Sequence, residues 1–215
     1  MLRETVALAT PMLRQAAGRL WGPRLDADGY RAWLHVCHDL VRATAPLLTE
    51  ALAESVRRDD GLLVDYFTEQ LAEEFGHDRW VEQDLAAAGV DPRSLADRVP
   101  APSAARLAGT QYYWIRHAHP VALLGHIAVL EWLPPRADLA GDLAARTGLP
   151  AAAFGTLARH AELDLSHGRR LDELLAALPA AGRHRRLLAI SALTTAYGLV
   201  ELMTDLVART PATRP

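Results

Sequence analysis

The sequence predicts an all-α, single-domain bundle of about seven to eight helices. Apolar residues recur at three-to-four spacing in almost every segment, which is the period of an amphipathic helix. Gly, Pro and Asp separate these segments, and no stretch alternates apolar and polar residues long enough to indicate a sheet. At 215 residues, half of them hydrophobic, the chain suits one core and is short for two.

The expected helices follow one another with short connections. The pattern predicts helices over Arg3 to Leu20, Ala27 to Arg57 with a kink at Pro46, Gly61 to Ala88, Ser103 to Ala118, Pro120 to Leu133, Ala137 to Thr147, Pro150 to Leu178, and Arg183 to Arg209. The proline-rich stretches between them are too short to be interdomain linkers. We therefore expect one domain over residues 1–210 and a frayed tail over residues 211–215.

Composition excludes several classes of protein. The net charge of -3 provides no basic field for nucleic acid or for a membrane surface, so a small-molecule substrate is the expected partner. All 23 basic residues are arginine, which excludes Schiff-base and P-loop lysine chemistry. The single cysteine, Cys37, cannot form an internal disulfide or a thiolate cluster. No export signal is visible, and the apolar run from Leu187 to Val200 is too short to span a bilayer, so we expect a soluble cytoplasmic protein.

Two helices carry residues with metal-ligand spacing. Glu74 and His77 are three residues apart, so on one helix they project from the same face and could close on one metal ion. His160, Asp164 and His167 stand at i, i+4 and i+7, within a band of roughly 60° along another helix. A solvated helix face is the more common explanation of the first pair. It would also explain Asp164 and one histidine of the second set, but two histidines aligned with an acid suit a divalent metal better.

A third helix contributes a carboxylate at its end. Glu131 follows an apolar run, where a buried charge is costly unless it is paired or binds metal, although alone it would be explained by exposure to water. His126, five residues earlier, points elsewhere and is left out of the ligand set. The six residues together, three carboxylates and three imidazoles from three helices, match what two carboxylate-bridged irons need in a helix bundle.

In order and spacing these motifs resemble the haem-oxygenase-like diiron oxidases and oxygenases, over roughly Leu63 to Leu175. That family takes a Glu and a His from one core helix, a Glu from the next, and a His-x-x-x-Asp-x-x-His set from a third. Some members place the first Glu seven residues before the His, where this chain has Gln70. The Glu-x-x-His spacing assigns that role to Glu74, with Glu73 as the alternative.

The resemblance implies two Fe(II) ions as cofactor, O2 as cosubstrate, and oxidation of a free amino acid or a fatty acid in secondary metabolism. Desaturation, carbon–carbon cleavage, N-oxygenation and ring or nitrile formation are the outcomes that it implies. The short chain favours a free amino acid, and a fatty-acid oxidase is the alternative. A homodimer and an external electron donor are compatible with this function. Tyr113 and Arg116 are candidates for contacting the substrate, with Arg116 as a carboxylate clamp, although core packing or a solvated helix end explains them as well.

Three other functions remain open. A haem oxygenase would need a proximal histidine, for which His35 or His38 could serve, but it would leave the aligned set on the third helix unexplained. A thiaminase-like enzyme would need Cys37 as nucleophile, and its apolar neighbours indicate an inert thiol. In a helical interaction protein without enzymatic activity, the histidines and acids would simply be surface residues.

Overall fold

The computed structural model describes residues 1–179 and 182–209, and these residues form helices and connections without strands. The predicted all-α class is confirmed, while the expected tail over residues 211–215 lies outside the described residues. The nine α-helices of the described residues are α1 (Leu2–Leu20), α2 (Ala27–Arg57), α3 (Gly61–Glu74), α4 (Asp78–Ala87), α5 (Pro102–His117), α6 (Leu123–Glu131), α7 (Leu139–Thr147), α8 (Gly155–Ala177) and α9 (Gly182–Arg209). Three short 3-10 helices, η1 (Pro92–Leu95), η2 (Pro120–Ala122) and η3 (Ala151–Phe154), complete the order.

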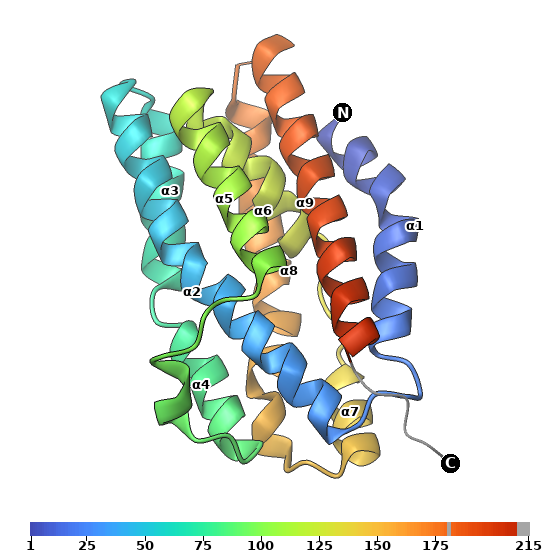
Figure 1. Cartoon of the computed structure of the whole chain (residues 1–215). Helices are drawn as coiled ribbons and strands as arrows, with labels where there is room; N and C mark the ends of the chain where they lie inside the picture. Colours follow the sequence, from blue (N-terminus) through green and yellow to red (C-terminus); the bar gives the residue numbers. More distant parts are fainter. Residues whose placement is uncertain (180–181, 210–215) are drawn as a thin grey trace.

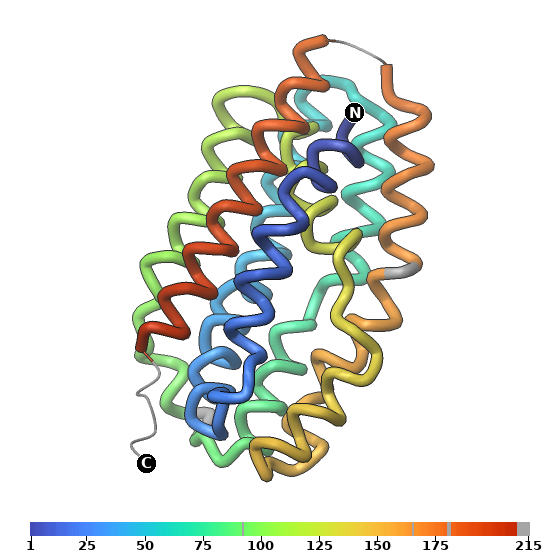
Figure 2. The backbone as a smooth tube through the Cα atoms, turned by 90° about the vertical axis from the view of Figure 1, so that its right-hand side faces the viewer, coloured from blue at the N-terminus to red at the C-terminus, as the bar shows by residue number. Residues whose placement is uncertain are grey.

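The long helices pack along one common direction, and the short helices α4 and α7 lie at one end of the bundle (Figure 1). The C-terminal helix α9 lies beside α1, as both views show (Figures 1 and 2), and it also packs against α5 and α6. The helix α2 runs unbroken through Pro46. This arrangement surrounds α6 with longer helices, so its residues are almost all buried.

The helix α9 is long and apolar enough to cross a membrane by length and composition alone. The expectation that the apolar stretch is too short therefore does not hold for the helix as a whole, because the helix continues to Arg209. Within the described residues the helix packs against α1, α5 and α6, and 33% of its most apolar 18-residue window is buried.

Apolar side chains form two main clusters, one on each side of the region where α3 ends. The larger cluster joins α1, α2, α3, α5, α6, α8 and α9, and the other joins the first half of α2 with α4, α7 and the start of α8. Within the second cluster, the Asp84 carboxylate of α4 accepts hydrogen bonds from the backbone N–H groups of Gly155 (3.1 Å) and Thr156 (2.8 Å) at the start of α8. These two hydrogen bonds satisfy the first N–H groups of α8 and hold its N-terminus against α4.

Candidate metal centre

The helix predicted over Gly61 to Ala88 is divided in two, which corrects that expectation. Helix α3 ends at Glu74, Phe75 is extended with ψ 117°, and Gly76 has φ +92°, a conformation that glycine adopts without strain. Helix α4 then begins after His77. Glu74 and His77 therefore meet across a tight turn, closed by a 3.2 Å hydrogen bond from the His77 N–H to the Glu74 carbonyl, rather than along one helical face.

Three side chains converge at this turn. The ligand atoms offered by Glu74, His77 and His160 all lie within 4.8 Å of one another. Nδ1 of His77 is 2.9 Å from Oε2 of Glu74, but it is buried and has no partner in hydrogen-bond geometry. Nδ1 of His160 lies 2.9 Å from the carbonyl oxygen of Thr156, which can only accept, so Nδ1 carries the proton and Nε2 is free as a ligand. This trio could hold one divalent cation.

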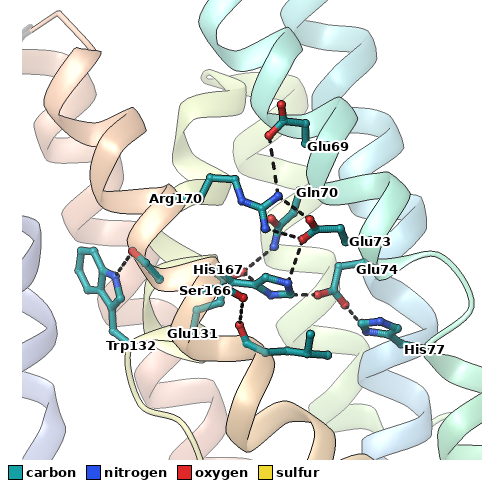
Figure 3. Close-up of polar contacts among 12 residues, drawn as sticks. Glu69, Gln70, Glu73, Glu74, His77, Glu131, Trp132, Ser166, His167 and Arg170 are labelled. Carbon is teal, nitrogen blue, oxygen red and sulfur yellow. Dashed lines mark hydrogen bonds and ion pairs between the residues drawn. The ribbon is translucent and has the colours of Figure 1, made fainter.

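The other oxygen of Glu74 faces a second group of side chains. Nδ1 of His167 lies 3.5 Å from Oε1 of Glu74 and 3.5 Å from Oε1 of Glu131. Figure 3 shows Glu74 between His77 on one side and His167 on the other. Glu131 is itself held by Gln70, whose Nε2 donates to its Oε1. The two carboxylate oxygens of Glu74 are thus directed at two different histidine-containing positions.

Glu73 has a different environment from its neighbour Glu74. Its carboxylate pairs with the Arg170 guanidinium, with Nη1 at 2.8 Å from Oε1, and lies 3.0 Å from Nε2 of His167 (Figure 3). The Glu73 side chain is 44% exposed, whereas that of Glu74 is 11% exposed. An Nε2–H donated to Glu73 leaves Nδ1 of His167 free to bind metal. Geometry therefore favours Glu74 as the ligand and Glu73 as the residue that orients His167.

The cluster concentrates acidic groups away from water. Burial raises the pKa of Glu131 to about 8 and that of Asp164 to about 7, and the charge of Glu74 adds to both shifts. Burial also opposes ionisation of Glu74, but the contacts with His77, His160 and His167 outweigh it and hold its pKa below the usual value. Three buried carboxyl groups beside three imidazoles are costly unless a cation compensates them.

Several buried polar atoms at this place have no hydrogen-bond partner among the described residues. They are Nδ1 of His77, Oε2 of Glu131, Oε1 of Gln70 and Oγ1 of Thr156. Two of these atoms have a carboxylate as neighbour, since Nδ1 of His77 lies 2.9 Å from Glu74 and Thr156 interacts with Asp84. Buried polar groups in folded proteins are normally satisfied, so the atoms of Gln70 and Glu131 remain open to a ligand. Two of the atoms, on His77 and Glu131, are good metal donors, and the residues present therefore fit a metal centre.

A cavity of about 300 Å³ opens beside the cluster. Glu74, Glu131, His160 and Asp164 line one part of it, and most of the remaining wall is apolar, from α2, α5 and α6. Its size is at the lower end of the range for small-molecule sites. A substrate in this cavity would lie directly against the proposed ligands.

The two residues suggested for substrate binding lie outside this cavity. Tyr113 is 58% exposed and stacks near Trp114 and His117. Arg116 forms a two-point ion pair with Glu50, at 2.9 Å and 3.1 Å, in an outer groove. Neither side chain lines the cavity, because both project from the part of α5 that faces away from it.

Sequence reasoning missed other residues that do line the cavity. Gln70 and Thr156 each present a buried polar atom beside the ligands. His126, which the sequence analysis left out of the ligand set, lies on the cavity wall. Gln70 could have been found from its position one helical turn before Glu74, which places both on one face of α3. Thr156 gives no such signal, since only the fold brings the start of α8 to this place.

The residues required by the rival functions have other environments. His38 lies 3.4 Å from the Glu82 carboxylate, and neither His38 nor His35 lines the cavity. Cys37 does line it, but burial, with a smaller effect of Asp84, raises the pKa of its thiol to about 12. A thiol that stays protonated at neutral pH is a poor nucleophile.

Comparison with known proteins gives results at two levels. A solved structure of a domain of unknown function with a heme oxygenase-like fold, from Shewanella denitrificans OS217, superposes with a TM-score of 0.83 at 15% identity, covering 99% of this chain and 95% of that one. This likeness establishes the fold. No curated protein gives a significant match. The family model of the iron-containing redox enzymes matches residues 31–199, most of the chain and all of the proposed ligands. The chain therefore belongs to this haem-oxygenase-like family of iron-containing redox enzymes.

Proposed function

We propose that the protein is a non-haem diiron oxidoreductase that uses O2 to oxidise a small substrate. The observation that carries this proposal is the position of Glu74, whose two oxygens are directed at two separate histidine-containing positions. A single carboxylate in this position can bridge two metal ions. When bound, a pair of ferrous ions would supply the activation of O2, and the iron-containing family fits that cofactor.

Each residue of the cluster has a distinct role in this proposal. His77 and His160 would hold one iron, His167 and Glu131 would hold the other, and Glu74 would contribute to both positions. Asp164 lies one helical turn after His160 on the same face of α8, so it completes the set. Around them, Gln70 fixes Glu131, the Thr156 carbonyl fixes the ring of His160, and Glu73 fixes the ring of His167.

The cavity favours a substrate with an apolar body. Over residues 1–179 and 182–209 no arginine lines it, and its acidic residues are the proposed ligands themselves. A free amino acid would have to bury its carboxylate there without a cationic partner other than the metal, which is costly. The apolar wall therefore supports an acyl chain, as in the fatty-acid alternative, more than the amino acid expected from chain length, and it is the apolar part of such a substrate, not a carboxylate, that the cavity favours. It also keeps water away from the reacting bond.

The test is anaerobic titration with Fe(II), followed by O2 exposure with a panel of fatty acids and amino acids. We expect close to two irons per chain, and we expect His77→Ala or Glu131→Ala to lower both iron content and O2 consumption. Glu162→Ala is the matched control, since Glu162 is an exposed acid on the same helix as His160. Full iron content and activity in both ligand variants would refute the assignment.

A further inference from the structure

His126 lies on the cavity wall but outside the ligand cluster. It precedes Glu131 by five residues on α6, which corresponds to about 7–8 Å along the helix axis at 1.5 Å per residue. Its surroundings on that wall are apolar and include Leu107, Leu123 and Ile127. A polar ring at such a position, away from the proposed irons, is available to the distal part of a bound substrate.

A buried chain of hydrogen bonds holds the His126 ring from behind. Nδ1 of His126 lies 3.0 Å from Oγ1 of Thr195, to which the Gln111 amide donates at 3.2 Å. The Ser191 hydroxyl donates to the other end of the Gln111 amide at 3.0 Å. Gln111, Ser191 and Thr195 are completely buried, so this network joins α5, α6 and α9 inside the protein and fixes the ring orientation.

The network also favours one tautomer of His126. The Thr195 oxygen accepts from Gln111, and Nδ1 of His126, 3.0 Å away, is the acceptor that the described residues offer to the Thr195 hydroxyl proton. An imidazole that accepts at Nδ1 is protonated at Nε2. His126 therefore has an N–H donor on the ring nitrogen that does not face Thr195.

We propose that His126 is a substrate-positioning residue whose Nε2–H donates a hydrogen bond to a neutral oxygen acceptor, a carbonyl or an ether, on an otherwise apolar substrate. This inference rests on the proposed function for the location of the reaction, and it adds the chemical class of the substrate. The hydrogen bond would hold the substrate at a fixed depth, which decides which of its bonds lies beside Glu74 and Glu131.

The acceptor is neutral rather than anionic because the surroundings provide no countercharge. Burial lowers the pKa of His126 to about 4, so the ring is uncharged at neutral pH. Among the residues that the structure describes, no arginine lines the cavity, so an anion at His126 would have no cationic side chain beside it. A carboxylate at His126 would lose the large hydration free energy of an anion and gain one hydrogen bond from a neutral donor. A carbonyl oxygen loses much less hydration free energy on leaving water.

The test compares two ligands of the same shape, 2-heptanone and 2-methyl-1-heptene, in which a methylene group replaces the carbonyl oxygen. Their dissociation constants are measured by ligand-observed NMR on the full chain, both metal-free and loaded anaerobically with Fe(II). We expect His126→Leu to weaken ketone binding about 3- to 10-fold, the range of one net hydrogen bond, and to change alkene binding less than 2-fold. Equal weakening of both ligands would overturn the proposal, because His126 would then only shape the cavity.

Two further measurements keep the proposal falsifiable if His126→Leu does not fold. Thr195→Val should weaken the ketone selectively, and Thr195→Ser, which keeps the hydroxyl group, should restore it. The ¹⁵N spectrum of His126 should show the proton on Nε2, and a proton on Nδ1 would refute the assignment. If heptanoate binds the metal-free protein more tightly than the ketone does, the proposal of a neutral acceptor is refuted. Iron content is measured separately, so a failure to bind two irons would contradict the proposed function and leave these ligand results standing.

Discussion

Replacing each of the two adjacent glutamates separately should have very different effects on iron binding. Glu74 is nearly buried, and its oxygens lie 2.9 Å from Nδ1 of His77 and 3.5 Å from Nδ1 of His167. Glu74→Gln removes the charge shared by both metal positions, so we expect the iron content to fall from about two to one or fewer per chain. The loss should exceed 100-fold in affinity for at least one iron, because a direct ligand is affected rather than an outer partner.

Glu73→Gln should be much milder. The amide oxygen can still accept from Nε2 of His167, and the lost ion pair with Arg170 is partly exposed, a kind of pair that contributes about 0–1 kcal/mol. Loss of an outer partner of a metal-binding histidine lowers the affinity for the metal by about 10-fold, so both irons should still bind at a high concentration of Fe(II). Glu69→Gln is the control, since Glu69 is exposed and only 3.8 Å from the same arginine.

The assay is an anaerobic Fe(II) titration against a competing chelator, repeated with Co(II), whose absorption spectrum reports each site without O2 chemistry. Unfolding midpoints of the metal-free variants separate loss of a ligand from loss of the fold. The reasoning fails if Glu73→Gln abolishes one iron while Glu74→Gln retains both. That result would make Glu73 the ligand, with a movement of the Arg170 side chain on metal binding.

Three other predictions test packing, the thiol and acid sensitivity. Gly125→Ala should destabilise the protein by about 1–3 kcal/mol, because its Cβ would overlap the Leu188 carbonyl oxygen of α9. Gly109→Ala, with open space around it, should stabilise the protein by about 0.5–1 kcal/mol, and chemical unfolding measures both changes. Cys37→Ser should leave turnover essentially intact, and loss of activity with the fold preserved would instead favour a thiol mechanism. Burial lowers the pKa of His119 to about 4, so the unfolded chain binds its proton more readily, and about 1 kcal/mol of stability should be lost as the pH falls from about 6.5 to 4. His119→Asn should lose less over that range, and equal acid sensitivity of the two proteins would contradict this.

The parts of the site that lie on one uninterrupted helix could be predicted from the sequence. His160, Asp164 and His167 all belong to α8, and the helical period alone places them on one face. For Glu74 and His77, the sequence predicts that the two side chains meet, but not that the helix breaks between them. A lone glycine inside a helical pattern is a weak boundary signal, so the break at Gly76 was not foreseen, although the two side chains still meet.

The position of the two suggested substrate contacts outside the cavity has a different physical origin. The buried residues Leu107, Gln111 and Ile115 of α5 recur every four positions and define its inner face. Tyr113 is two residues from Gln111, about 200° around the helix, and so lies on the opposite side. Nearness to a motif in the sequence is therefore a poor predictor of nearness to the site. The position of a residue around the helix axis is a better one. By the same phase Gln111 points inward and reaches Thr195 behind His126, a contact between α5 and α9 that no local pattern could indicate, because it depends on how the two helices pack.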